Sequence, residues 1–508
     1  MLTASPARQS ASRRAALPLL PGLAVAAAAV PVFRGALGYG FSQDDFAGLA
    51  RAAGLLPRLA EPWRFLSHQA FFDVMRATAG LDARPYHLAS LALHAACALL
   101  LWVFLRRRLD GPAALAGAVF FAAHPALYTA LYWISAIGDP GALLFALAAL
   151  LALLRRDRWR WAALPLYALA LLCKESVLLL PVAAAAVLGS DPDRTPAGRR
   201  AWRDPVVLSL ALVAAAYLVY YLAADAMGQH VGGTRGSPYG SGLSPAIAWN
   251  ALTYLGWSLN VPLPLVRSFS DAIDPAVYPW GAVALLLWLA GLRSRALRAR
   301  GWLAAGALTL AFLAPVLPLE HHTYHYYLYA PLPGIAWCLA AALDAALARL
   351  RPTAAWVTAA ALATALAVNG AALVRKVESF PFGATGLRAD PTVDRARIAT
   401  NALADLRAAG LPRGARLLFW SPIAEGGVSA TPSPRESYWE RNVRAALLDG
   451  LAVRVMLPQV GGVEFVRAFR PAPEPYRYAV YRPDGKLGVA TPAELDSLIR
   501  ANAGARGR

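Results

Sequence analysis

The sequence predicts a mainly α-helical protein: a polytopic bundle of transmembrane helices followed by a small soluble α/β domain. Long apolar segments recur between residues 15 and 374, and arginine clusters separate many of them. Hydrophobic residues make up 58% of the 508 residues and charged residues only 16%, with a mean hydropathy of +0.44. This composition is typical of a membrane protein. Beyond residue 374 it changes to that of a soluble domain, so we expect domains at residues 1–374 and 375–508.

The net charge of +19 indicates orientation in a membrane rather than a nucleic-acid partner. Arginine supplies nearly all of it, since only three of the 49 basic residues are lysines. The arginine clusters lie between apolar segments, where they are expected on the inner side of the membrane. The three cysteines fall in apolar segments without metal-ligand spacing, which argues against a disulfide framework or a zinc site.

The first apolar segment, about residues 15–37, is long and lacks a convincing cleavage site, so we expect a retained span rather than a signal peptide. A loop on the outer side follows at residues 38–85. Within it, Glu61–Met75 mixes aromatic and charged residues and predicts an amphipathic helix in the interface. Further spans are expected at about residues 86–105, 112–130 and 139–154.

The next apolar stretch, Trp161–Leu188, is interrupted by Lys174 and Glu175. One continuous helix would place this charged pair at mid-length in lipid, which is costly. We therefore expect two short spans that meet at an outer corner. A further span is expected at about residues 205–224.

Residues 246–266 are apolar but contain two asparagines and two prolines. If they crossed the membrane, the arginines at 293–300 would face outward, against the positive-inside rule. We interpret this stretch as an interfacial or re-entrant helix that borders a cavity. About eleven spans result, with an outer C-terminus, because four more are expected at about residues 280–292, 301–317, 327–347 and 353–374.

The C-terminal region alternates helix and strand patterns, which predicts a small α/β domain. Helices are expected at Asp394–Ala409, Tyr438–Leu448 and Pro492–Ile499, and strands at Arg416–Trp420, Ala452–Leu457 and Tyr476–Tyr481. The region has no glycine-rich phosphate loop and no nucleophile elbow. It is expected either to recognise a ligand or to cover an active site.

Two adjacent carboxylates, Asp44 and Asp45, begin the first outer loop, in the segment GYGFSQDDF. One interpretation is that one of them is a catalytic base at the membrane surface. The alternative is that Asp44 caps a short helix, since Asp is a preferred N-cap residue. The two roles do not exclude each other.

Six short segments occur in the order found in one enzyme superfamily. They are the acidic pair, PWRFLS at Pro62–Ser67, RPYHLASLALH at Arg84–His94, HPALYTALYWISAIGDP at His124–Pro140, CKES at Cys173–Ser176 and PLEHHTYHYYLYAP at Pro318–Pro331. On these segments, residues 15–374 resemble the GT-C superfamily of polytopic glycosyltransferases. The likeness is greatest to the bacterial branch related to protein O-mannosyltransferases and aminoarabinose transferases.

The resemblance implies an inverting transfer of a sugar from a polyprenyl-phosphate donor to a lipid, glycan or protein acceptor. It implies a multi-pass protein of the bacterial inner membrane, with its active site and C-terminus in the periplasm. Asp44 is the expected base, with Asp45 close behind. Donor or acceptor contacts are expected from Asp139, Lys174, Glu175, Arg235, Arg267, His321, His322, Tyr324 and His325. No cofactor is required by this chemistry, and a divalent metal stays open.

Each of these contact residues also has a structural interpretation. Asp139 is equally suited to cap the helix that it opens. Lys174 and Glu175 suit a structural ion pair, and Arg235 and Arg267 suit lipid headgroups. The histidines are expected to hydrogen-bond phosphate or sugar more than to bind metal, and the tyrosines among them to form an interfacial belt.

Two other classes of function stay open at this stage. A lipid or glycan transporter is expected to show inverted repeats and charges deep within its spans. A membrane anchor for a C-terminal binding domain is expected to tolerate loss of Asp44. The carboxylates lie near predicted outer ends of spans, which favours an enzyme.

Overall fold

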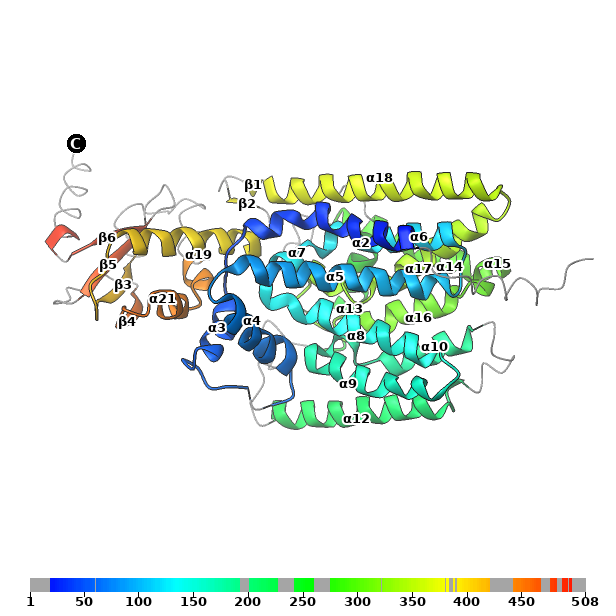
Figure 1. Ribbon diagram of the computed structural model, residues 1–508, viewed down its shortest axis with the longest axis horizontal. Helices are drawn as coiled ribbons and strands as arrows, with labels where there is room; N and C mark the ends of the chain where they lie inside the picture. The colour runs from blue at the N-terminus through cyan, green and yellow to red at the C-terminus, as the bar shows by residue number, and fades with distance from the viewer. Residues whose placement is uncertain are drawn as a thin grey trace, which may run out of the picture. The chain divides into compact units, whose positions relative to one another are not determined.

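A computed structural model describes residues 19–59, 61–191, 201–226, 242–259, 275–320, 322–379, 381–382, 387–388, 391–420, 442–466, 476–481, 487–491 and 493–495 (Figure 1). The described chain is mostly helical and contains a small sheet. It divides into two compact units. The first comprises residues 1–34, 89–131 and 136–375, and the second residues 35–88, 132–135 and 376–508. The outer loop that contains Asp44 and Asp45 thus groups with the C-terminal region.

The first unit is a bundle whose long helices run roughly parallel to one another in Figure 1. Within the part of the chain that the structure describes, five helices are long and apolar enough to cross a membrane, or six if one bent pair counts as a single span. The helices, some of which extend into the second unit, are α2 (Leu19–Phe33), α5 (Ala83–Arg106), α6 (Gly111–Ala122), α7 (Tyr128–Tyr132), α8 (Gly138–Leu153), α9 (Ala163–Cys173), α10 (Leu180–Gly189), α12 (Pro205–Ala226), α13 (Ala246–Trp257), α14 (Val277–Arg293), α15 (Arg295–Ala299), α16 (Trp302–Leu313), α17 (Leu332–Leu347) and α18 (Pro352–Ser379).

Short 3-10 turns join several of these helices. They are η1 (Arg34–Gly38), η3 (Pro125–Leu127), η4 (Ile134–Ile137), η5 (Arg158–Ala162), η6 (Glu175–Val177) and η7 (His325–Leu328). The expected break at Lys174 is confirmed, because α9 ends at Cys173 and Lys174 adopts an extended backbone before η6. The expected third span bends by 42° between α6 and the segment Pro125–Tyr132. Proline at 125 lacks the backbone N–H that a continuous helix would use there.

Small residues allow close helix packing in the bundle. At Gly281 of α14, an added Cβ would lie 2.0 Å from the carbonyl oxygen of Leu252 in α13. At Gly256 of α13, it would lie 2.6 Å from the carbonyl oxygen of Val277 in α14. The two backbones therefore approach through reciprocal glycines, as membrane helices commonly do. The re-entrant placement of residues 246–266 and the total of eleven spans stay predictions, since residues 260–274 lie outside the described chain.

The second unit combines helices from the outer loop with the C-terminal α/β elements. The loop contributes α3 (Asp45–Ala52), the π-helical turn η2 (Leu66–Ala70) and α4 (Phe71–Ala79). The C-terminal region contributes β1 (Pro381–Phe382), β2 (Leu387–Arg388), α19 (Pro391–Ala408), β3 (Arg416–Trp420), α21 (Leu451–Met456), β4 (Gly462–Val466), β5 (Tyr476–Tyr481) and β6 (Leu487–Ala490). The four-stranded sheet has the order β4-β3-β5-β6. Strand β3 is parallel to both neighbours, and β5 is antiparallel to β6.

The predicted α/β alternation is confirmed for α19, β3 and β5, and residues 442–446 and 493–495 are helical. The prediction of a strand at Ala452–Leu457 is wrong, because helix α21 occupies that segment. A six-residue apolar run does not distinguish strand from helix by periodicity alone. Here Gly450, with φ of +88°, starts a helix that buries Ala452, Val453 and Val455. Strands β1, β2, β4 and β6 were not predicted.

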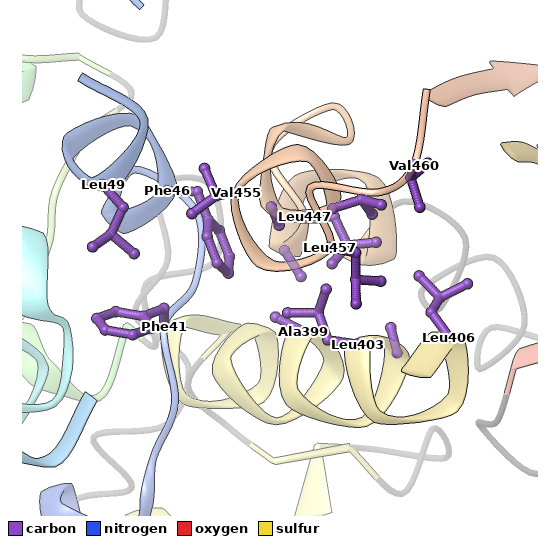
Figure 2. Close-up of a cluster of buried hydrophobic side chains, with 14 of the residues drawn as sticks. Phe41, Phe46, Leu49, Ala399, Leu403, Leu406, Leu447, Val455, Leu457 and Val460 are labelled. Atoms are coloured by element: carbon purple, nitrogen blue, oxygen red, sulfur yellow. The ribbon is translucent and has the colours of Figure 1, made fainter. Parts of the chain in front are cut away.

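A single hydrophobic core holds the outer loop onto the C-terminal helices (Figure 2). Phe41, Phe46 and Leu49 of the loop pack with side chains of α19, with residues 446–447 and with residues 452–460. A backbone bond reinforces this packing, since the N–H of Gln43 donates to the carbonyl of Ala446 at 3.1 Å. The acidic pair thus lies on a loop that is anchored at both its apolar side chains and its backbone.

Candidate active site

Asp45 is a buried anchor of the outer loop. Its side chain is 1% exposed, and both of its oxygens accept hydrogen bonds. Oδ2 accepts from the N–H of Ser42 at 2.9 Å. Oδ1 accepts from the N–H of Ser135 at 2.7 Å and from its hydroxyl at 2.6 Å. The carboxylate therefore joins the start of α3 to a segment 90 residues further along the chain.

Burial dominates the ionisation of Asp45. Desolvation disfavours the charged form and raises the pKa of this carboxyl from 3.8 to about 7. The hydrogen bonds from Ser135 and Ser42 oppose the rise, and the negative charge of Asp44 adds to it. A group with this pKa would suit proton transfer, but Asp45 has almost no exposed surface at which a substrate could meet it.

Asp44 has the opposite setting, although it is the adjacent residue. It is exposed and immediately precedes α3, at the N-cap position. The expected cap position is confirmed, but the side chain makes no capping hydrogen bond. Successive residues at a helix start point about 100° apart, so burial of Asp45 turns Asp44 outward. The pKa of Asp44 is raised by desolvation, because the surrounding protein displaces water from it.

Three arginines act on Asp44. The positive charges of Arg64, Arg51 and Arg395 all lower its pKa and so favour its charged form. Arg395 is held by Gln43, whose Oε1 accepts from its Nη1 at 2.5 Å, and by Asn442, whose Oδ1 accepts from its Nε at 2.9 Å. Both Gln43 and Arg64 adopt positive φ, of 53° and 50°, which is uncommon for residues other than glycine.

These three arginines were not predicted to belong to the candidate site. Arg64 was visible in the quoted segment PWRFLS, and Arg51 follows Asp44 by two helical turns, so a helical projection of residues 44–51 would have found it. Arg395 offered no local signal. The charges of these guanidinium groups act on an exposed carboxylate, so this part of the second unit combines a candidate base with groups of the kind that bind phosphate.

A second cluster lies in the first unit. Lys174 donates from Nζ to Oδ2 of Asp139 at 2.7 Å, and the two side chains are 9% and 1% exposed. The ammonium also lies 4.9 Å from the ring centre of Tyr326 and 5.4 Å from that of Tyr327. Lys174 is therefore ion-paired with Asp139, whereas the sequence had suggested Glu175 as its ion-pair partner. Asp139 lies in the first turn of α8, whose N-cap residue is Ile137.

The aromatic and histidine residues after residue 321 extend this cluster. The hydroxyl of Tyr326 lies 3.5 Å from Nε2 of His322, whose ring is edge-on to Tyr324 at 4.3 Å. The ring of His325 packs against that of Trp257 at a tilt of 36°, with ring centres 4.0 Å apart. Asp139, Lys174, Tyr326 and Tyr327 thus lie together within the first unit. That Asp139, the Lys174–Glu175 corner and His321–His325 converge near Asp44, as expected from their places at outer ends of spans, stays a prediction, because His321 lies outside the described residues and Asp44 belongs to the other unit.

The other residues predicted to contact the donor or acceptor are Glu175, Arg235, Arg267 and His321. Glu175 begins η6 and is partly exposed. Arg235, Arg267 and His321 lie outside the described residues. Among the described residues, no group of three or more His, Cys, Asp or Glu side chains is placed to hold a metal ion. The possibility of a divalent metal stays untested.

The buried ion pair predicts a distinctive pattern of stability. Lys174→Ala leaves the carboxylate of Asp139 buried without its cation and should lower stability by about 3–5 kcal/mol. The double variant Lys174→Met/Asp139→Leu removes both charges and should recover most of that loss. Thermal unfolding of the detergent-solubilised protein measures both. Arg155→Ala, which breaks an exposed ion pair with Asp157, is the control and should barely change the midpoint. A double variant no better than Lys174→Ala would contradict the pairing.

Asp45 predicts a dependence of stability on pH. Its pKa is higher in the folded state, at about 7, than the ordinary 3.8, so the folded protein retains a proton that the unfolded chain releases. Its contribution to stability is complete below pH 3.8 and is lost as the pH rises to about 7, by about 4 kcal/mol at most. Asp45→Asn does not titrate, so wild type should lose stability relative to this variant between pH 4 and 7. Parallel unfolding curves across that range would show that Asp45 has an ordinary pKa.

No protein-family model matches this chain, and no curated protein sequence matches it. Among solved structures, the chain is similar to ArnT from Cupriavidus metallidurans, in a crystal structure with bound undecaprenyl phosphate. The identity is 16%, the match covers 87% of this chain and 75% of that chain, and the TM-score is 0.42.

Proposed function

We propose that this protein is an inverting glycosyltransferase that moves a sugar from a polyprenyl-phosphate donor to an acceptor at the outer face of a membrane. The observation that supports the proposal most directly is that the two adjacent carboxylates, Asp44 and Asp45, lie in different environments. Asp45 is a buried anchor, and Asp44 is an exposed carboxylate on the same loop, within the influence of three arginines. The order of the six sequence segments supports the choice of this reaction among those that a carboxylate can catalyse.

The proposed reaction assigns one role to each part of this surface. Asp44 takes a proton from the acceptor as the acceptor's oxygen or nitrogen forms a bond to C1 of the sugar. The bond between C1 and the phosphate oxygen breaks on the opposite side, which inverts the configuration. Polyprenyl phosphate leaves with the electron pair. Guanidinium groups such as those of Arg51, Arg64 and Arg395 suit stabilisation of that anion, because they bind phosphate with several directed donors.

The proposed location follows from the apolar helices and the arginine clusters. We place the protein in the bacterial inner membrane, with Asp44 and the C-terminal region in the periplasm. A lipid-linked donor suits a site at the boundary between lipid and water, since its chain remains in the bilayer. The acceptor is a lipid, a glycan or a protein that reaches this surface.

Replacement of Asp44 tests the proposed base. Asp44→Asn keeps the shape of the side chain but removes its basicity, so transfer should fall by about 10²- to 10⁴-fold. The amount of folded protein should hardly change, because the residue is exposed and makes no capping bond. The assay measures glycan product formed by membranes, normalised to folded protein, with and without a chelator to detect a metal requirement.

Asp45→Asn is the matched control for this assay. It loses the acceptor for the N–H of Ser42 or for Ser135, so it should lower the yield and stability of the protein more than its activity per folded molecule. Full activity of Asp44→Asn together with loss in Asp45→Asn would transfer the role of base to Asp45. Full activity of the double variant would end the enzyme proposal and favour a transporter or an anchor.

The proposed topology makes a separate prediction. Positive charges after the second, fourth and sixth expected spans place those loops inside, and an odd number of spans places the C-terminus outside. A reporter fused after Arg508 that works only when exported should therefore be active. A reporter that works only in the cytoplasm and is active at the same position would contradict this topology and the re-entrant interpretation of residues 246–266.

A further inference from the structure

A small cavity opens in the second unit, between the start of the outer loop, its end and helix α19. Its volume is about 340 Å³, near the lower limit for ligand pockets in proteins. Residues 37–41 and 81–84 form two of its sides, and Thr400, Leu403 and Arg407 of α19 form a third. Asp44 does not line it, so the cavity is separate from the proposed base.

The apolar floor of this cavity is rigid. Phe41 and Phe46 are 4% and 0% exposed and belong to the core that joins the loop to α19. The ring of Phe41 packs edge-on against Tyr86, with ring centres 5.0 Å apart. Because these side chains are held by the core, the floor exists before a ligand binds. A preformed floor lowers the cost of ordering a ligand site.

The glycines of the segment GYG bring backbone to the cavity wall. A Cβ at Gly40 would lie 2.4 Å from the hydroxyl oxygen of Thr400, so only glycine allows this approach. A Cβ at Gly38 would have no heavy atom within 4 Å, so there the backbone borders open space. Thr400 donates its hydroxyl proton to the carbonyl of Ala396 at 2.8 Å, which leaves its oxygen lone pairs as acceptors.

The charged residues that line the cavity carry a net positive charge. Arg84 and Arg407 are exposed lining residues that carry guanidinium groups, and Asp82 is the lining carboxylate. Asp82 already accepts a hydrogen bond from the N–H of Arg84 at 3.0 Å. One net positive charge therefore faces a space that also offers a hydroxyl, backbone groups and aromatic carbon. Guanidinium groups bind carboxylate and phosphate with paired donors.

We infer that this cavity binds a monosaccharide-sized ligand that carries one acidic group, such as a uronic acid or a sugar phosphate. The volume limits the ligand to a small molecule or to a single terminal unit of a longer one. The two arginines bind the acidic group, and Thr400 and Asp82 accept hydrogen bonds from hydroxyls. The inference concerns binding at a separate site and does not depend on the transfer reaction.

The test measures binding to the full-length protein in nanodiscs of zwitterionic lipid. Glucuronic acid and glucose 6-phosphate are the acidic probes, and glucose is the neutral one, with saturation-transfer NMR and titration calorimetry as readouts. Both acidic probes should bind at least tenfold more tightly than glucose. Arg84→Gln and Arg407→Gln should each weaken their binding about tenfold or more, as loss of a charged hydrogen bond commonly does.

Two further variants keep the test independent of folding. Gly38→Leu places a side chain into the open space next to Gly38 and should abolish binding without lowering the unfolding midpoint. Arg413→Gln removes an exposed arginine that does not line the cavity and should leave binding unchanged. The inference is overturned if neither acidic probe binds, if glucose binds equally well, or if binding survives Gly38→Leu. Because no step uses turnover, failure here leaves the proposed function untouched.

Discussion

The buried carboxylate of Asp45 is the constraint on which the outer loop depends. Its two oxygens accept from the backbone N–H of Ser42, three residues away in sequence, and from the N–H and hydroxyl of Ser135, 90 residues away. Burial of such a group without these partners would cost several kcal/mol. The arrangement therefore holds the start of α3 against Ser135, and the core around Phe46 holds the same turn against the C-terminal helices. The orientation of Asp44 is a consequence of both.

The first unit follows the same rule, that a buried charged group needs a partner. Lys174 and Asp139 are buried among apolar helices, and each is tolerated because the other is present. Tyr326 and Tyr327 add aromatic faces to the ammonium group. Each unit thus buries a carboxylate together with hydrogen-bond donors, and the carboxylate of Asp44 stays exposed.

The apolar pattern predicted much of the fold because it depends on local sequence. The break at Lys174 followed from the cost of charge in lipid, and the alternation in the C-terminal region gave α19, β3 and β5. The pattern predicted a strand where helix α21 lies, because six residues are too few to distinguish the repeat of a strand from that of a helix. The acidic pair was located, but the different roles of its members were not predictable. They depend on Ser135 and on Arg395, which reach the loop only through the tertiary fold.

The most direct test of the account is the chemical accessibility of the two adjacent carboxyl groups. The folded protein is treated with a carbodiimide and an amine at about pH 6, and fragment-ion mass spectrometry assigns the modification within residues 41–51. Asp44 should be modified at least tenfold faster than Asp45, and the two rates should become similar after unfolding. Equal rates in the folded protein, or faster modification of Asp45, would contradict the division between an exposed base and a buried anchor.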